Sequence, residues 1–133
     1  MQISVRGFMR IVMAAFLLFG FVLHFRATDK LVAITPDWVP FAREVLLATG
    51  VLELVLAATL LIPSLRKTSG IVVALYVLAV WPANIKHAFE PVVVPPIPDT
   101  WWYHAPRLAL QPVIAWWALY AARVTNWPFS RAA

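Results

Sequence analysis

Four long apolar stretches constrain this chain more than any other feature of its sequence. They cover approximately residues 7–25, 41–62, 68–88 and 105–122. A helix needs roughly 17–25 apolar residues to cross the hydrocarbon of a bilayer, so each stretch qualifies as a span. The composition agrees, because 62% of the residues are hydrophobic and 13% charged, against about 45–50% and 25% in soluble domains. The sequence therefore predicts an all-α membrane protein, a four-transmembrane-helix bundle, and makes a soluble enzyme improbable.

The connections between the stretches predict how the helices follow one another. Only PSLRK separates the second stretch from the third, which predicts antiparallel neighbours. The other two connections are longer and rich in Pro and Trp. Proline at that density cannot continue a helix, so we expect ordered interfacial loops with room for a short helical turn. The first stretch lacks the small-residue pattern of a signal-peptide cleavage site, so we expect it to be retained. The 133 residues then form a single integral membrane domain, 1–133.

The charges predict an orientation in the membrane. One side of the predicted bundle carries six cations and no acid, namely Arg6, Arg10, Arg66, Lys67, Arg123 and Arg131. The other side mixes five cations with five acids, namely Arg26, Lys30, Arg43, Lys86 and Arg107 with Asp29, Asp37, Glu44, Glu90 and Asp99. Because Lys and Arg favour the cytoplasmic side, we expect both termini to be cytoplasmic. The net charge of +5 then reflects orientation, and nucleic-acid binding is not expected because the basic residues form no stripe.

Aromatic residues mark both predicted interfaces. We expect Trp38, Trp101, Trp102 and Tyr103 to form an outer belt at the membrane surface. Trp127 and Phe129 would lie at the inner interface. Together with the charges, these residues predict a multi-pass protein of the bacterial inner (cytoplasmic) membrane, with the lipid bilayer as its first partner.

A short set of polar residues falls inside the predicted spans, where such residues are the first candidates for function. They are His24, Glu53, Asn84, His87, Arg107 and Gln111. Glu53 lies deepest, twelve residues at about 1.5 Å each beyond Phe41. On the predicted topology all six occupy the outer half or the midplane of the bilayer. This coincidence predicts a polar site between the helices.

The spacing of these residues predicts that they face the bundle interior. The second helix brings Gly50, Glu53 and Ala57 to one face, and small residues there let a neighbouring backbone approach closely. The fourth helix has a matching stripe of polar and then small residues, consisting of Arg107, Gln111, Ala115, Ala118 and Ala122. Pro82 and Pro112 interrupt the helices nearby and free backbone acceptors. Asn84, Gln111 or Arg107 would then either satisfy those acceptors and hold the bundle together, or contact a ligand.

Glu53 admits three interpretations. An unpaired carboxylate at mid-bilayer would take up a proton and only fix helix packing. Alternatively it pairs with Arg107, with help from Gln111. The third interpretation is a role in binding a polar ligand or relaying a proton.

Cofactor motifs are absent from the sequence. His24 and His87 are weak haem candidates that would ligate from opposite sides, but no haem-attachment or di-iron spacing accompanies them. We expect no metal site and no catalytic residue, and we keep haem as the lesser alternative. No cysteine is present, which excludes disulfides and thiolate ligands.

Five segments, in order and spread over nearly the whole chain, resemble the DoxX-like family of small four-helix bacterial membrane proteins. The strongest motifs are the G-x-x-E of Gly50–Glu53, the P-A-N-I of Pro82–Ile85 and the R-L-x-L-Q of Arg107–Gln111. The full segments are Phe16–Phe25, Thr35–Phe41, Thr49–Gly70, Trp81–Ala88 and Arg107–Leu119. Trp81 stands where the family often has Phe, and Lys86 departs from its frequent Tyr.

The resemblance implies a four-helix bundle in the bacterial cytoplasmic membrane. It also implies a redox association, since the family's named example is a subunit of a thiosulfate:quinone oxidoreductase. It carries over no catalytic residue. Most members of the family have no established activity.

Three functions compete at this point. The first is a non-catalytic subunit of a redox complex that binds a quinone or similar lipid-soluble ligand, through Glu53, Asn84, Arg107, Gln111, His24 and Trp81. The second is a structural or assembly subunit in which the same residues only hold the bundle together. The third, a transporter or proton pathway, would be expected to have convincing inverted repeats, which this chain lacks. We expect the chain to have a protein partner or to form a homo-oligomer.

Overall fold

The computed structural model describes residues 4–90 and 100–129, and all its regular structure there is helical. The helices are α1 (Val5–Arg26), α2 (Thr28–Ala33), α3 (Ala42–Leu60), α4 (Arg66–Ala79), α5 (Trp81–Phe89) and α6 (Trp101–Ala121). The predicted all-α class is confirmed. The first and second predicted stretches agree with α1 and α3 within two residues at each end. The expected helical turn in the first connection is α2.

The third predicted span, 68–88, corresponds to the helical segment Arg66–Phe89, which is interrupted near Pro82 as the sequence predicts. The structure divides it into α4 and α5 at Val80. Pro82 lacks the N–H that would continue the ladder, and it disfavours helical geometry in the residue before it. Proline is tolerated in a first helical turn, so a new helix begins at Trp81.

The fourth helix begins earlier than the sequence predicted. α6 begins at Trp101 instead of residue 105, so Trp101, Trp102 and Tyr103 are helical rather than part of a loop. The N–H groups of Tyr103 and His104 both bond to the Thr100 carbonyl at 2.9 Å. The remainder of the third connection, 91–99, lies outside the described residues, as do Asp99 and Arg131 of the charge prediction.

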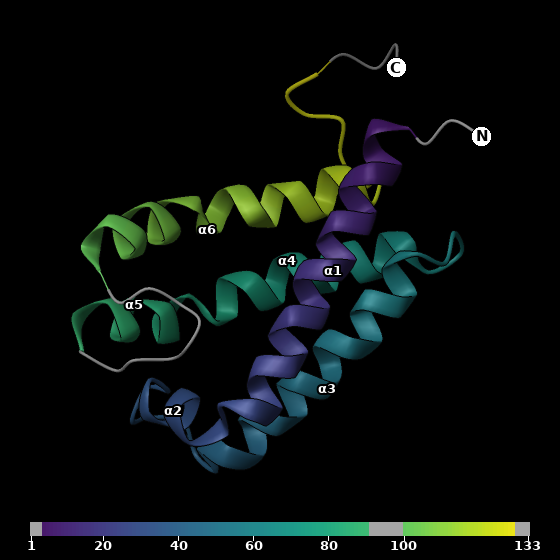
Figure 1. The fold of residues 1–133 in the computed structure, drawn as a ribbon. Coiled ribbons are helices and arrows are strands. Elements are labelled where there is room, and N and C mark those ends of the chain that lie inside the picture. Colours follow the sequence, from purple (N-terminus) through teal and green to yellow (C-terminus); the bar gives the residue numbers. More distant parts are fainter. Residues whose placement is uncertain (1–3, 91–99, 130–133) are drawn as a thin grey trace.

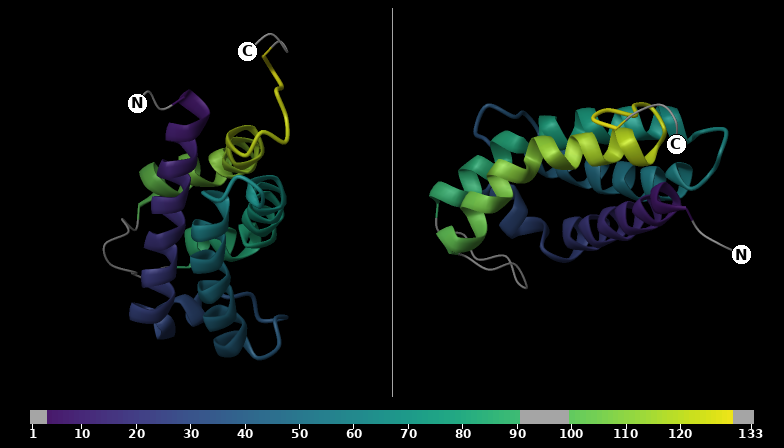
Figure 2. Two further views of the ribbon diagram at one scale, coloured as in Figure 1. Left: turned by 90° about the vertical axis from the view of Figure 1, so that its right-hand side faces the viewer. Right: turned by 90° about the horizontal axis from the view of Figure 1, so that it is seen from above.

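The helices form two crossing pairs rather than one parallel bundle. α1 packs mainly against α3, and α4 mainly against α6, while α3 and α4 diverge at a wide angle (Figures 1 and 2). The expectation that α3 and α4 are antiparallel neighbours is therefore wrong. Small residues explain the pairing, because Gly70 of α4 lies directly against Ala118 of α6 and against Ala122, the residue that ends this helix.

The hydrophobic core lies where the two pairs meet. Its largest fully buried apolar side chains are Met13, Leu17, Leu60 and Val73. The start of α1, the α3–α4 turn and the end of α6 lie together at this end (Figure 1). At the other end Lys86 of α5 donates to the Thr35 carbonyl at 2.9 Å and to Asp37 at 3.2 Å. The two pairs are thus in contact at both ends.

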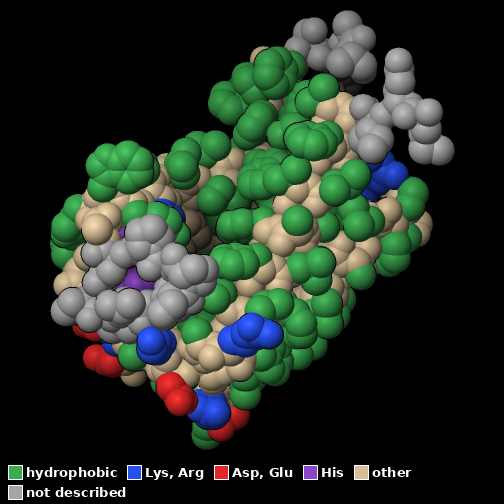
Figure 3. Space-filling view, viewed as in Figure 1, with side chains coloured by type: hydrophobic (Ala, Val, Ile, Leu, Met, Phe, Trp, Pro, Cys, Tyr) green, Lys and Arg blue, Asp and Glu red, His purple; other side chains and the backbone are tan. Residues whose placement is uncertain are grey.

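The outer surface of the helices is strongly apolar. Large hydrophobic side chains cover much of the face in Figure 3. Among the exposed hydrophobic residues of the described helices, Phe8, Phe16, Val55 and Leu75 are all more than 40% exposed. By length and composition, two described helical segments are able to cross a membrane, Val5–Arg26 and Arg66–Phe89.

The contact between α4 and α6 gives a stability prediction. In Gly70→Ala the added methyl group would meet the Ala122 methyl and the Ala118 carbonyl oxygen, and such overpacking costs about 1–3 kcal/mol. We expect a lower free energy of unfolding, measured in detergent. Adding Ala122→Gly to the Gly70→Ala variant should restore part of the lost free energy of unfolding, because this second substitution removes one of the two clashing groups. Ala48→Val, which enlarges an exposed residue of α3, should have little effect, and an unchanged stability of Gly70→Ala would contradict the packing described.

Candidate functional site: a cavity between the helix pairs

A cavity of about 370 Å³ lies between the two helix pairs. Side chains from α1 and α3 form one wall, and those from α4, α5 and α6 form the other. Most lining residues are apolar, and Trp38 lies among them on the segment between α2 and α3. The polar lining residues are His24, Thr35, Thr49, Glu53, Tyr76, Asn84, Tyr103, Arg107 and Gln111. This size and lining are typical of a site for a small, mainly apolar ligand.

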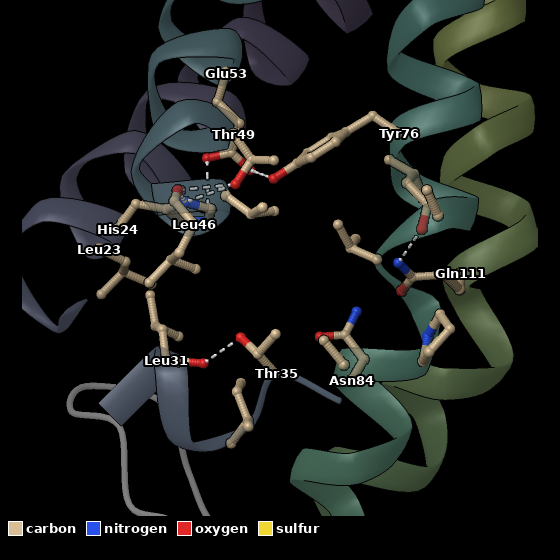
Figure 4. Close-up of a pocket in the computed structure, with 18 of the residues that line it drawn as sticks. Leu23, His24, Leu31, Thr35, Leu46, Thr49, Glu53, Tyr76, Asn84 and Gln111 are labelled. Atoms are coloured by element: carbon tan, nitrogen blue, oxygen red, sulfur yellow. Dashed lines mark hydrogen bonds and ion pairs between the residues drawn. The ribbon is translucent and has the colours of Figure 1, made fainter. Parts of the chain in front are cut away.

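Figure 4 shows how the labelled polar residues face one another across this space. His24, Thr49 and Glu53 lie on the wall of α1 and α3, and Asn84 and Gln111 lie opposite. Five of the six predicted ligand-binding residues therefore line one cavity. Trp81 is the exception, because it is not among the lining residues.

His24 is held in one tautomer by the backbone of α3. Its Nδ1 lies 2.7 Å from the Leu46 carbonyl oxygen, which can only accept a hydrogen bond, so Nδ1 carries the hydrogen. In the neutral ring Nε2 is then an acceptor. Nε2 faces Glu53, at 3.8 Å from Oε2.

Glu53 is 8% exposed, and one of its two oxygens is bonded. Tyr76 of α4 donates to Oε1 at 2.8 Å. Oε2 is buried and has no hydrogen-bond partner among the described residues. The deepest acid of the sequence thus keeps one buried oxygen without a partner among the described residues, beside the cavity that its residue lines.

Two glycines make this arrangement possible. A side chain at Gly20 of α1 would occupy the place of the Glu53 carboxyl group. A side chain at Gly50 of α3 would come within 2.8 Å of the His24 Cβ atom. The predicted face of small residues on the second helix is confirmed, since Gly50, Glu53 and Ala57 are all buried.

The opposite wall is held by hydrogen bonds to the backbone. Gln111 of α6 donates to the Val77 carbonyl at 2.7 Å, close to the break between α4 and α5. Arg107 donates to the Asn84 carbonyl at 3.2 Å and lies over the Tyr103 ring, with Cζ 5.0 Å from its centroid. Gln111 and Arg107 thus bond to backbone carbonyls of α4 and α5 on either side of Pro82.

Two sequence interpretations of this wall are wrong. Glu53 does not pair with Arg107, because the phenol of Tyr76 takes its place. His24 and His87 do not face one site either, since His87 is not a lining residue and its ring packs against His104 at 4.9 Å between centroids. Among residues 4–90 and 100–129, no group of three or more His, Cys, Asp or Glu side chains is placed to hold a metal ion.

Several residues of the site were not predicted from the sequence. Tyr76, Thr49 and Thr35 were not among the polar candidates, although each carries a hydroxyl group within or beside a predicted span. Tyr76 was the most accessible to prediction, because it is a phenol in the middle of an apolar helix. Nothing in the neighbouring sequence predicts that the His104 side chain is buried, with 1% of its surface exposed.

The fold and the cavity together define an all-helical protein with two described segments able to cross a membrane and an internal, mainly apolar site. A family model with the description "Domain of unknown function (DUF8561)" matches residues 13–122, and the chain belongs to this family. Neither a curated protein nor a solved structure matches the chain. The family description states no function, and the resemblance to the DoxX-like family stays a prediction.

The bond between Tyr76 and Glu53 gives a second testable prediction. Tyr76→Phe removes the only donor to Glu53 among the described residues and leaves a buried acceptor unpaired, which costs about 1–3 kcal/mol. We expect that loss in the free energy of unfolding in detergent. In the Glu53→Leu variant, Tyr76→Phe should lower the free energy of unfolding much less, because the carboxylate acceptor is already gone. Tyr103→Phe keeps the ring over Arg107 and serves as the control; equal losses in both phenylalanine variants would argue against a special role for the Tyr76 hydroxyl.

Proposed function

We propose that the protein is a DoxX-like integral membrane protein of the bacterial cytoplasmic membrane, with α1, α3, α4–α5 and α6 as its four spans. The apolar outer surface of these helices supports the proposal, as do the two segments long and apolar enough to cross a bilayer. The polar and small residues of the fourth predicted stripe, such as Gln111 and Ala115, are buried in α6, as membrane bundles require.

The distribution of charge supports an orientation with both termini in the cytoplasm. Arg6, Arg10, Arg66, Lys67 and Arg123 belong to the end that holds the start of α1, the α3–α4 turn and the end of α6. None of these five pairs with an acid in the described part of the chain. At the other end Arg43 pairs with Asp29 and Lys86 with Asp37. An excess of cations on one side is typical of the cytoplasmic face.

We further propose that the cavity binds a quinone or a similar lipid-soluble ligand, as a non-catalytic subunit of a redox complex. The observation that carries this proposal is the convergence of polar groups from both helix pairs on one mainly apolar cavity of about 370 Å³. A quinone head group needs an apolar slot with hydrogen-bonding groups at its two oxygens. The Asn84 side chain makes no hydrogen bond to another described residue, so its amide is available as a donor.

A structural subunit is the second candidate. Specific contacts favour it, because Gln111 binds the Val77 carbonyl and Tyr76 binds Glu53, and both bonds tie different helices together. Polar and small residues in membrane helices perform this task without any ligand. The two functions differ in whether a ligand stabilises the protein.

Ligand binding is tested with decylubiquinone and the purified protein in nanodiscs. We expect the midpoint of thermal unfolding to rise with decylubiquinone concentration. Asn84→Ala should weaken binding by roughly threefold to tenfold, the value of one neutral hydrogen bond. Ala83→Phe should abolish binding by filling the cavity.

Two matched variants control for these changes. Asn126→Ala and Ala48→Phe make the same kinds of change at exposed residues outside the cavity, and both should bind as the unmodified protein does. Absence of any decylubiquinone-dependent stabilisation would reject the ligand-binding proposal and favour the structural subunit.

The orientation is tested by cysteine labelling, which is clean because the chain has no cysteine of its own. Lys30→Cys and Ser64→Cys place one thiol at each end, at exposed residues. In intact cells of a bacterial host with a permeabilised outer membrane, a membrane-impermeant maleimide should label Lys30→Cys. It should label Ser64→Cys only after the inner membrane is opened. The reverse pattern would invert the proposed topology, and equal labelling of both would rule it out.

A further inference from the structure

The distance between the His24 and Glu53 side chains restricts which chemical group of a ligand can bind between them. His24 Nε2 and Glu53 Oε2 lie 3.8 Å apart, which is too far for a direct hydrogen bond. Both atoms belong to residues that line the cavity. The two atoms are therefore neighbours that a third polar group can join.

The other bonds of these two side chains restrict what that group must be. His24 Nδ1 has given its hydrogen to the Leu46 carbonyl, which leaves Nε2 as the acceptor of the neutral ring. Glu53 Oε1 already accepts from Tyr76. Oε2 has no partner among the described residues. Beside the cavity, the two side chains therefore place two neighbouring atoms that are acceptors unless a proton is added to one of them.

A hydroxyl group makes one more hydrogen bond to the pair than a carbonyl oxygen does whenever the pair carries no proton or one proton. With no proton on the pair it donates to one of the two atoms, and with one proton it accepts from one and donates to the other. A carbonyl oxygen only accepts, so it leaves at least one atom unpaired unless both carry a proton. An unpaired buried acceptor is costly, and sites of this kind reject analogues that lack the hydroxyl.

We infer that the site selects a ligand with a phenolic hydroxyl, the hydroquinone form of a lipid-soluble quinone rather than the quinone itself, and that this hydroxyl lies between His24 Nε2 and Glu53 Oε2. The inference rests on the proposed ligand-binding function and adds the chemical form of the ligand. Thr49 supports the placement, because its Oγ1 donates to the same Leu46 carbonyl at 2.9 Å and fixes the local backbone. Asn84, on the opposite wall, then faces the other end of the head group.

The test compares three forms of one head group under anaerobic conditions. Decylubiquinol, decylubiquinone and the dimethyl ether of decylubiquinol are titrated separately into the protein in nanodiscs. We expect decylubiquinol to bind about tenfold more tightly than decylubiquinone, and the dimethyl ether to bind no better than the quinone. This comparison needs no variant, so it stands even if a substitution impairs folding.

A variant then assigns the preference to Glu53. Glu53→Gln keeps an oxygen for Tyr76 and places an NH₂ group, a donor, at the position of Oε2. We expect the preference for decylubiquinol to disappear or reverse, because a carbonyl now finds a donor. Glu44→Gln makes the same change at an exposed residue of the same helix and should keep the preference.

The outcomes separate the inference from the proposed function. If decylubiquinol and decylubiquinone bind equally, as they would with only a water molecule between the two atoms, the inference is overturned and the ligand site stands. If Glu53→Gln retains the preference, the hydroxyl lies elsewhere and the inference is likewise wrong. If none of the three compounds binds, both the proposed function and the inference fail.

Discussion

Burial of the Glu53 carboxyl group is the constraint on which the site depends. A carboxyl group inside an apolar helix pair is costly unless it is hydrogen-bonded. Here the phenol of Tyr76 supplies one bond from a helix of the other pair. Gly20 supplies the space, since any side chain there would displace the carboxyl group. Burial of this one acid therefore brings α1 close to α3 at Gly20. It also requires α4 to place Tyr76 within hydrogen-bonding distance of Glu53.

The cavity follows from the way the two helix pairs are joined. At one end the pairs meet in the hydrophobic core, where Met13, Leu17, Leu60 and Val73 are buried. At the other end Lys86 reaches the Thr35 carbonyl and Asp37. Between these contacts the bond from Tyr76 to Glu53 links the pairs, and residues of both face a common space. An internal site of this kind, with hydrogen-bonding groups on both walls, suits a ligand that enters from the lipid, and it gives the proposed function its physical basis.

Much of the site was predictable because its polar residues are conspicuous in apolar helices. His24, Glu53, Asn84, Arg107 and Gln111 were all found by their position inside a span, and all five line the cavity. Trp81, expected as an aromatic neighbour of these polar residues, does not line it. The partners of these residues were predicted less well. Pairing with Arg107 was one of three interpretations of Glu53, whereas the structure gives it a neutral phenol, and Arg107 instead contacts the Asn84 carbonyl.

The sequence by itself determined that the described chain is helical, that small and polar residues share the buried face of α3, and which side chains are candidates for a site. These properties follow from local composition and from a period of 3.6 residues, which any single helix carries. Only the tertiary structure decided that α1 pairs with α3 and α4 with α6, and that His24 rather than His87 faces Glu53. Those outcomes depend on which surfaces approach one another, and the contacts responsible join residues far apart in the chain, such as Gly70 with Ala122 and Tyr76 with Glu53. Periodicity cannot report such contacts, because it describes the face of a helix and not the helix that covers it.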